Sequence, residues 1–131
     1  MKAETQIQIS PEIEYIDFDS DPKAGRYVFT YTITIVNQGP VGARLLSRHW
    51  IITDATDKVQ EVRGKGVVGE QPHLRPGESF EYTSGTRLRT PTGTMHGRYF
   101  CVAVDGEKFD VDIPMFVLDA LSDTGSRKHM H

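Results

Sequence analysis

Three glycines, Gly64, Gly66 and Gly69, have the G-x-G-x-x-G spacing with which dinucleotide-binding folds hold a pyrophosphate. That chemistry needs a helix after the glycines, because the helix N-terminus donates the amides that contact the phosphates. Residues 70–77 contain two prolines, which a regular helix does not tolerate. A Walker loop is excluded as well, because no Lys-Ser or Lys-Thr pair follows the glycines. The sequence therefore predicts a loop whose glycines supply positive φ angles or close backbone approach.

The same segment leaves two kinds of small ligand open. Successive backbone amides can form a concave nest for a small anion, such as pyrophosphate or a nucleotide phosphate, and basic neighbours strengthen it. A divalent cation near residues 64–69 is the other ligand. The candidate residues for binding an anion or a partner are Arg63, Gly64, Lys65, Gly66, Val68, Gly69, Glu70 and His73, with Arg48 and His49 as rim residues.

Two valines in this segment suggest protein binding. Val67 and Val68 lie between glycines, in a stretch too apolar for an ordinary loop. In one interpretation they pack under the loop. In the other they line a groove for a peptide or partner strand, together with Leu74 and the rim residues. On the second interpretation, Val68→Asp should abolish partner capture without unfolding the domain.

An acidic segment and the histidines raise the question of a metal site. Residues 17–21 carry aspartate at alternate positions, as a calcium-binding EF-hand loop begins. That loop needs glycine at its sixth position and glutamate at its twelfth, where this chain has Pro22 and Val28. A solvated acidic turn is therefore expected. No metal-ligand spacing relates His49, His73 and His96, and no metal site is predicted.

Nucleophilic catalysis finds no support in the pattern. Serines and histidines are present, but no Gly-x-Ser-x-Gly elbow exposes a serine. The single cysteine, Cys101, lies in an apolar run, where a packed and reduced thiol is the expectation. A lone cysteine also excludes an internal disulfide. We therefore predict a domain that is not an enzyme and has no cofactor.

Hydrophobic and polar residues alternate along most of the chain, which indicates β-strands. The candidate residues must therefore lie on strands or on the turns between them. In residues 27–35, aromatic residues and isoleucine fill every second position, as in a strand with one buried face. Seven or eight such strands with turns between them predict an all-β antiparallel sandwich. We expect a hairpin at Asp105-Gly106, a sheet edge at residues 60–63, and an end to the last strand at Pro114. The other strands are expected at residues 7–15, 45–53, 80–84, 99–104 and 109–113.

Length and charge set the domain count and exclude some partners. The chain has 131 residues, and we assign residues 1–121 to one domain and residues 122–131 to a flexible tail. A net charge of −3 argues against nucleic-acid binding, which normally requires a basic surplus. No apolar stretch is long enough to cross a bilayer and no signal-peptide core is present, so a cytoplasmic protein is expected.

One spacing indicates the type of sandwich. Gly97-x-Tyr99-x-Cys101, with Trp50 upstream, has the pattern found in immunoglobulin-like domains. There the tyrosine forms a corner, its hydroxyl bonding to nearby backbone, and the tryptophan packs across from it. The partner cysteine is missing here, so we expect a disulfide-free sandwich of the fibronectin type III kind.

Four sequence blocks resemble the ApaG family. They are LSRHW at residues 46–50, GKGVVGEQP at 64–72, YTSG at 82–85 and IPMF at 113–116. The resemblance covers about residues 5–118 and implies a fibronectin type III-like domain in a bacterial cytosolic protein. It also implies an interaction module, since related domains occur in an F-box protein and in a protein that interacts with DNA polymerase delta. The family is linked to cobalt and magnesium efflux or resistance, and its partner protein is unidentified.

Overall fold

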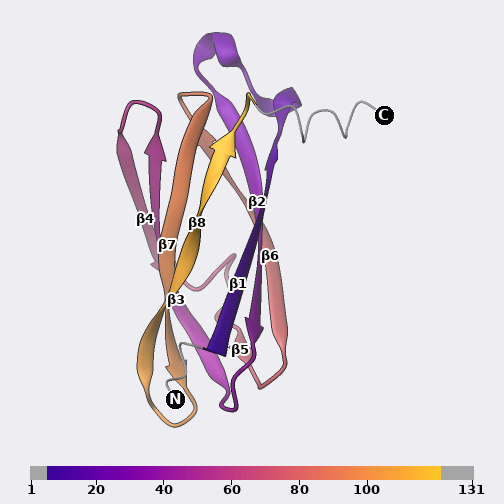
Figure 1. Ribbon diagram of the computed structural model, residues 1–131, viewed down its shortest axis with the longest axis vertical. Coiled ribbons are helices and arrows are strands. Elements are labelled where there is room, and N and C mark those ends of the chain that lie inside the picture. Colours follow the sequence, from indigo (N-terminus) through magenta and orange to yellow (C-terminus); the bar gives the residue numbers. More distant parts are fainter. Residues whose placement is uncertain (1–5, 122–131) are drawn as a thin grey trace.

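A computed structural model describes residues 6–121, which form two antiparallel β-sheets packed face to face (Figure 1). One sheet has the strand order β1-β2-β6; the other has the order β4-β3-β7-β8, with β5 also pairing with β3. The predicted all-β sandwich is confirmed. The strands are β1 (Ile7–Tyr15), β2 (Tyr27–Asn37), β3 (Ala43–Asp54), β4 (Val59–Lys65), β5 (His73–Leu74), β6 (Ser79–Leu88), β7 (Thr92–Ala103) and β8 (Lys108–Asp119). The predicted tail, residues 122–131, lies outside the described residues.

The three-stranded sheet is built around β2, whose alternation is the clearest in the chain. Its residues Phe29, Tyr31, Ile33 and Ile35 are buried toward the other sheet, and the residues between them are half-buried. Aromatic and β-branched side chains suit such a pleated, partly buried surface. Strands β1 and β6 pair with β2 on either side, so β6 is left as a sheet edge.

Two short 3₁₀ turns follow β1 in the acidic segment. They are η2 (Asp17–Asp19) and η3 (Pro22–Ala24). Ser20 joins this segment to the sheet, because its hydroxyl donates to the Ile16 carbonyl at 2.7 Å and accepts from the Val28 N–H at 2.9 Å. The expected acidic turn is therefore an ordered one. None of the helical segments in residues 6–121 has the length and apolarity required to span a membrane.

Strand β3 connects most elements of the second sheet. It pairs with β7 on one side and, on the other, first with β5 and then with β4. The glycine segment between β4 and β5 therefore runs beside β3, and the Gly66 N–H donates to the Leu46 carbonyl at 2.8 Å. As predicted, β4 is an edge strand; β7 lies inside the sheet, between β3 and β8. The glycine segment is thus part of a sheet edge.

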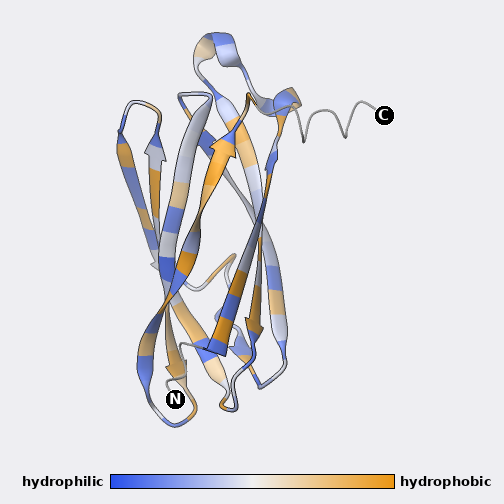
Figure 2. Cartoon of the chain, viewed as in Figure 1, coloured by the Kyte–Doolittle hydropathy of each residue, from blue (hydrophilic) through white to orange (hydrophobic). Residues whose placement is uncertain are grey.

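The core lies between the sheets, and hydrophobic and hydrophilic segments alternate along the strands that enclose it (Figure 2). Trp50 is central, with ring centroids 5.3 Å from Tyr31, 5.9 Å from Phe116 and 6.3 Å from Tyr99. All three contacts are edge-on, a geometry worth about 0.5–1.5 kcal/mol per pair beyond the area buried. The predicted packing of Trp50 against Tyr99 is confirmed.

The tyrosine corner predicted at Tyr99 is wrong. The Tyr99 hydroxyl pairs with the hydroxyl of Tyr82, which comes from β6 in the opposite sheet. Both side chains are buried, and a buried hydroxyl needs a partner, so each satisfies the other. Burial raises the pKa of both hydroxyls above the usual value for tyrosine.

The last strand does not end at Pro114, contrary to the prediction. Strand β8 continues to Asp119, and its register with β7 shifts between Met95 and Gly97. A bulge of this kind, on an edge strand, accommodates a proline that cannot donate to the ladder. The predicted turn at Asp105-Gly106 does connect β7 to β8, and Gly106 has a φ of 93°.

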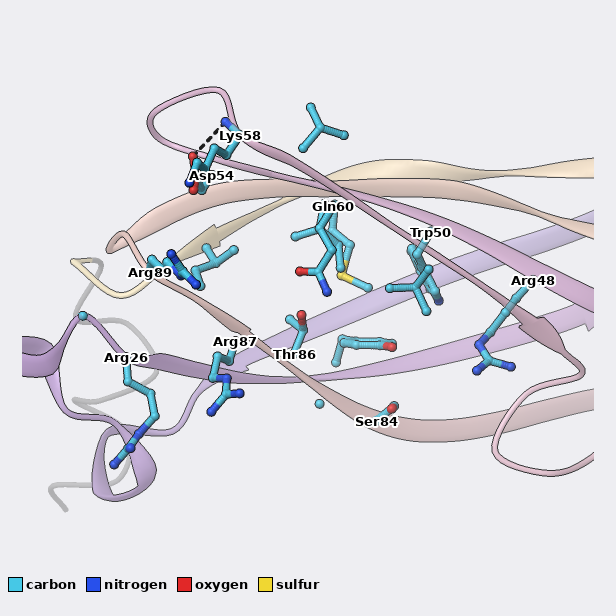
Figure 3. Close-up of a pocket in the computed structure, with 18 of the residues that line it drawn as sticks. Arg26, Arg48, Trp50, Asp54, Lys58, Gln60, Ser84, Thr86, Arg87 and Arg89 are labelled. Atoms are coloured by element: carbon cyan, nitrogen blue, oxygen red, sulfur yellow. Dashed lines mark hydrogen bonds between the residues drawn. The ribbon is translucent and has the colours of Figure 1, made fainter.

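The two long sides of the sandwich differ. Strand β1 packs against β8 and closes one side. On the other side the edge strands β4 and β6 are separated by a groove of about 870 Å³ (Figure 3). We call it the β4–β6 groove.

Candidate functional site

The glycine segment forms a tight hairpin turn just after β4. Val67 and Glu70 exchange two backbone hydrogen bonds, of 2.8 and 2.9 Å, across the central residues Val68 and Gly69. Both central residues have positive φ, 42° and 84°, as a type I′ turn requires. Gly69 adopts this conformation without strain, whereas a β-branched residue such as Val68 disfavours it.

Close approaches account for the other two glycines. Gly66 has a φ of 63°, and a Cβ there would collide with the Glu70 carbonyl oxygen. At Gly64 a Cβ would lie 2.7 Å from the guanidinium of Arg48. That guanidinium is fixed in place, because its Nη1 donates to the Gly66 carbonyl at 2.8 Å. Close packing therefore explains Gly64 and Gly66, the turn conformation explains Gly69, and the anion nest stays a prediction.

The two valines of this turn differ in burial. Val67 is 0% exposed and packs in the core, as one of the two interpretations predicted. Val68 is 52% exposed at the tip of the turn. Replacing Val68 with aspartate is therefore expected to leave the fold intact, and its effect on partner capture stays a prediction.

Replacing Val68 with asparagine is expected to raise the free energy of unfolding by about 1 kcal/mol. The change creates an Asn-Gly pair at the centre of the type I′ turn, and asparagine tolerates positive φ where valine is strained. Urea denaturation measures the gain. Val67→Asn is the matched control and should destabilise strongly, because it buries an amide in the core. An unchanged midpoint for Val68→Asn would show that Val68 makes compensating contacts at the tip.

Positive charge is concentrated in the β4–β6 groove. Five of the fifteen lysines and arginines line it, whereas its single carboxylate is Asp54. Among residues 6–121 none of the five forms a salt bridge, since the ion pairs found there join Glu61 to His49 and Arg63. Hydrogen bonds, chiefly from the Thr56 hydroxyl, lower the pKa of Asp54. The five groove cations are Arg26, Arg48, Lys58, Arg87 and Arg89.

Four of these cations lie at the two ends of the groove (Figure 3). One end, near the 3₁₀ turns, carries Arg26, Arg87 and Arg89. At the other end Arg48 lies beside Trp50. Arg48 and Asp54, which both line the groove, are six positions apart on β3, which amounts to about 20 Å of extended strand. The groove is therefore elongated, with a cationic group at each end.

Trp50 lies at the Arg48 end and lacks one expected interaction. Its side chain is 2% exposed, and its Nε1 is the only buried side-chain polar atom within residues 6–121 that has no hydrogen-bond partner. A buried N–H left unpartnered costs about 1–3 kcal/mol. Nearby, burial raises the pKa of the Tyr31 hydroxyl, and the Ser84 side chain partly offsets this effect. This end of the groove therefore contains several N–H and O–H groups and no carboxylate.

The predicted rim residues lie on different faces of β3. Arg48 lines the groove, whereas His49 lies on the opposite face, because successive side chains of a strand alternate. The His49 Nε2 is 2.7 Å from a Glu61 oxygen, and this hydrogen bond lowers the pKa of Glu61. Arg63 is 3.4 Å from the same carboxylate oxygen. The remaining predicted side chains are exposed along the sheet edge: Lys65, Val68, Glu70 and His73.

Metal and thiol chemistry are not evident in the described part of the chain. No three or more histidine, cysteine or carboxylate side chains of residues 6–121 converge as metal ligands. Cys101 is buried in β7, and burial, with a smaller contribution from Asp110, raises the pKa of its thiol to about 12. A raised pKa is the opposite of what an activated nucleophile needs.

Sequence reasoning missed four of the five groove cations. It identified Arg48 only as a rim residue, and Arg26, Lys58, Arg87 and Arg89 not at all. One available signal was Arg87-x-Arg89, which follows the strand predicted at residues 80–84 and comes just before a Thr-Pro turn. That spacing places both side chains on one face of an extended segment.

Comparison with known proteins agrees with this fold. The ApaG domain family matches residues 17–103. Protein ApaG of Thiobacillus denitrificans is 65% identical over 113 residues, covering 86% of this chain and 89% of that protein. Protein ApaG of an Acidovorax species is 55% identical over 121 residues, covering 92% and 88%. The crystal structure of an ApaA protein from Bordetella pertussis has a TM-score of 0.86 and 52% identity, covering 88% of this chain and 94% of that one.

Proposed function

The chain belongs to the ApaG family, and on that premise we propose that its domain is a non-catalytic module that binds an extended acidic segment of a partner protein in the β4–β6 groove. The observation that carries the proposal is the charge of the groove. Five cationic side chains and one carboxylate line it, in a chain whose net charge is −3. A concave surface lined by one sign of charge concentrates ligands of the opposite sign.

The shape of the groove supports an extended ligand. Along β3 the groove extends from Arg48 to Asp54, about 20 Å of extended strand, which an extended segment of about six residues spans. A single small anion would occupy only one end. Strands β4 and β6 flank the groove as sheet edges, whose unpaired backbone groups can pair with an added strand. Charge at both ends would then fix the position of the segment along the groove.

The ionisable groups support a role without catalysis. The raised pKa values belong to Tyr31, Tyr82, Tyr99 and Cys101, all of them buried and held in their neutral forms. A general base or nucleophile near neutral pH requires a group poised to change charge there. In this proposal, the family's predicted link to cobalt and magnesium efflux is exerted through the bound partner.

An eight-residue polyglutamate peptide tests the proposal, with an eight-residue polylysine peptide as the reference. We expect polyglutamate to shift backbone resonances of groove residues in β4 and β6, and polylysine to leave them in place. The double variant Arg87→Gln/Arg89→Gln should weaken polyglutamate binding about tenfold, since each exposed charge contributes up to about 1 kcal/mol to the binding free energy. Binding should also fall steeply at about 0.5 M NaCl, because salt screens exposed charges.

The double variant Arg75→Gln/Arg98→Gln is the matched control. It removes the same two charges from exposed positions outside the groove, so the net charge of the two variants is equal. Equal weakening by both pairs would contradict a groove site and indicate a general charge effect. A titration with pyrophosphate that moves only the amides of residues 63–71 would instead favour the anion nest of the glycine turn.

A further inference from the structure

The Arg48 end of the groove contains hydrogen-bond donors that are not fully used. Arg48 Nη1 donates to the carbonyls of Lys65 and Gly66, at 3.3 and 2.8 Å. Within residues 6–121 its Nε and Nη2 make no hydrogen bond, although they carry the other N–H groups of the guanidinium. The two backbone carbonyls and the contact with Gly64 therefore orient the guanidinium and leave one of its edges available.

Trp50 supplies an independent sign that an acceptor is missing here. Its Nε1 is buried and has no partner among the described residues. The rings of Tyr31, Tyr99 and Phe116 pack edge-on against the indole, so an acceptor would reach it from the groove that Trp50 lines. An indole N–H is a donor only, so its missing partner must be an acceptor. An oxygen atom of a ligand would meet this requirement.

The surroundings favour a charged acceptor over a neutral one. The only carboxylate that lines the groove, Asp54, lies at the far end, six residues along β3 from Arg48. The Ser84 hydroxyl lies on β6 across from Arg48 (Figure 3). Guanidinium groups bind carboxylates and phosphates with two parallel hydrogen bonds. The same donors would hold a carbonyl oxygen less strongly, because hydrogen bonds to a charged acceptor are stronger.

We propose that Arg48 and Trp50, with the Ser84 hydroxyl beside them, form an oxyanion subsite that holds one carboxylate or phosphate group at the Arg48 end of the groove. The subsite deepens the proposed function, on which its assignment to a partner's acidic segment rests. It defines the anchor of that segment, whereas Arg26, Arg87 and Arg89 hold the charges that follow. A glutamate, an aspartate or a phosphorylated residue supplies the same chemistry.

The sequence contains one tryptophan, so the indole N–H resonance of Trp50 is a unique reporter of the subsite. The full chain is titrated with sodium acetate and with inorganic phosphate, and sodium chloride at equal ionic strength serves as the reference. We expect both oxyanions to shift the Trp50 indole resonance in a saturable way and chloride to leave it unchanged. No saturable shift, or an equal shift with chloride, would overturn the subsite.

Arg48→Gln and Arg44→Gln form a matched pair of variants. Both arginines are on β3 and donate from Nη1 to a backbone carbonyl, Arg44 to that of Gln71 at 2.7 Å, but only Arg48 lines the groove. Arg48→Gln should weaken phosphate binding about tenfold, and Arg44→Gln should leave it unchanged. Equal affinities of the two variants would count against the subsite. The titration of the unaltered chain decides the question even where Arg48→Gln does not fold.

Peptides separate this inference from the proposed function and identify the source of the oxyanion. Polyglutamate and a phosphoserine octapeptide are each added, and the one that shifts the Trp50 indole at lower concentration names the preferred group. If polyglutamate binds the groove but the indole does not move, the subsite is wrong and the proposed function stands. If acetate moves the indole but polyglutamate does not bind, the subsite stands and the acidic segment is wrong.

Discussion

Replacing Gly97 with alanine is expected to lower the free energy of unfolding by about 3 kcal/mol. Gly97 lies in the central strand β7, directly opposite Trp50 of β3. A Cβ at this position would collide with the His49 carbonyl oxygen and lie 3.1 Å from the Trp50 Cα. These are backbone atoms, which cannot rotate away as the end of a side chain can. The two strands would therefore have to separate at the centre of the core.

Gly85→Ala is the matched control for this substitution. Gly85 is also a strand glycine, but a Cβ there would meet only the Phe29 carbonyl oxygen, at an ordinary 3.5 Å. The free energy of unfolding of the Gly85→Ala variant should therefore change by less than about 0.5 kcal/mol. Urea unfolding followed by Trp50 fluorescence measures both variants. A similar small change for Gly97→Ala would show that β3 and β7 can move apart at little cost.

Local patterns in the sequence were sufficient to predict the sandwich and seven of its eight strands, though not β5 or the full lengths of β7 and β8. The alternation in β2 is strict because one face of that strand is buried along its length, so periodicity alone identifies it. Periodicity could not show which of Val67 and Val68 is buried. A type I′ turn, and not a strand, sets their directions, and its presence depends on positive φ at a valine, which propensity disfavours.

Two predictions failed where the outcome depends on contacts between distant segments. Tyr99 was expected to bond to nearby backbone, but the Tyr82 hydroxyl reaches it from the other sheet. The sequence spacing carries no information about which hydroxyl arrives from across the sandwich. Likewise, Pro114 ends a strand only where its missing N–H is needed, and the bulge in β8 removes that need.

The candidate groove could not be predicted because its existence depends on how the two sheets close. Strand β1 meets β8 on one side, whereas β4 and β6 remain apart on the other. Arg26, Arg48 and Arg87 come from three different strands or their flanks, and their sequence positions do not show that they face one space. The net charge of −3 even conceals their concentration, because the acidic residues lie elsewhere.

Cys101 is expected to react with iodoacetamide about a thousandfold more slowly in the native protein than in the urea-denatured chain at pH 8. The thiolate is the reactive form, and burial raises the native pKa to about 12, against about 8.5 in an unfolded chain. The native rate should rise about tenfold per pH unit toward pH 12, whereas the denatured rate levels off above about pH 8.5. Stopped samples at several pH values, resolved by mass spectrometry, measure both rates.

The reaction of Cys101 with iodoacetamide also tests the predicted destabilisation by Gly97→Ala. A buried thiol that is neutral at pH 8 can also react through transient unfolding, at a rate set by the population of open molecules. Gly97 lies in the same strand as Cys101, so Gly97→Ala should raise the population of open molecules. A loss of about 3 kcal/mol in the free energy of unfolding corresponds to about a hundredfold faster modification through transient unfolding. An unchanged rate in a destabilised Gly97→Ala variant would mean that iodoacetamide reaches Cys101 in the folded protein. The folded protein would then react through the small thiolate fraction that the raised pKa allows.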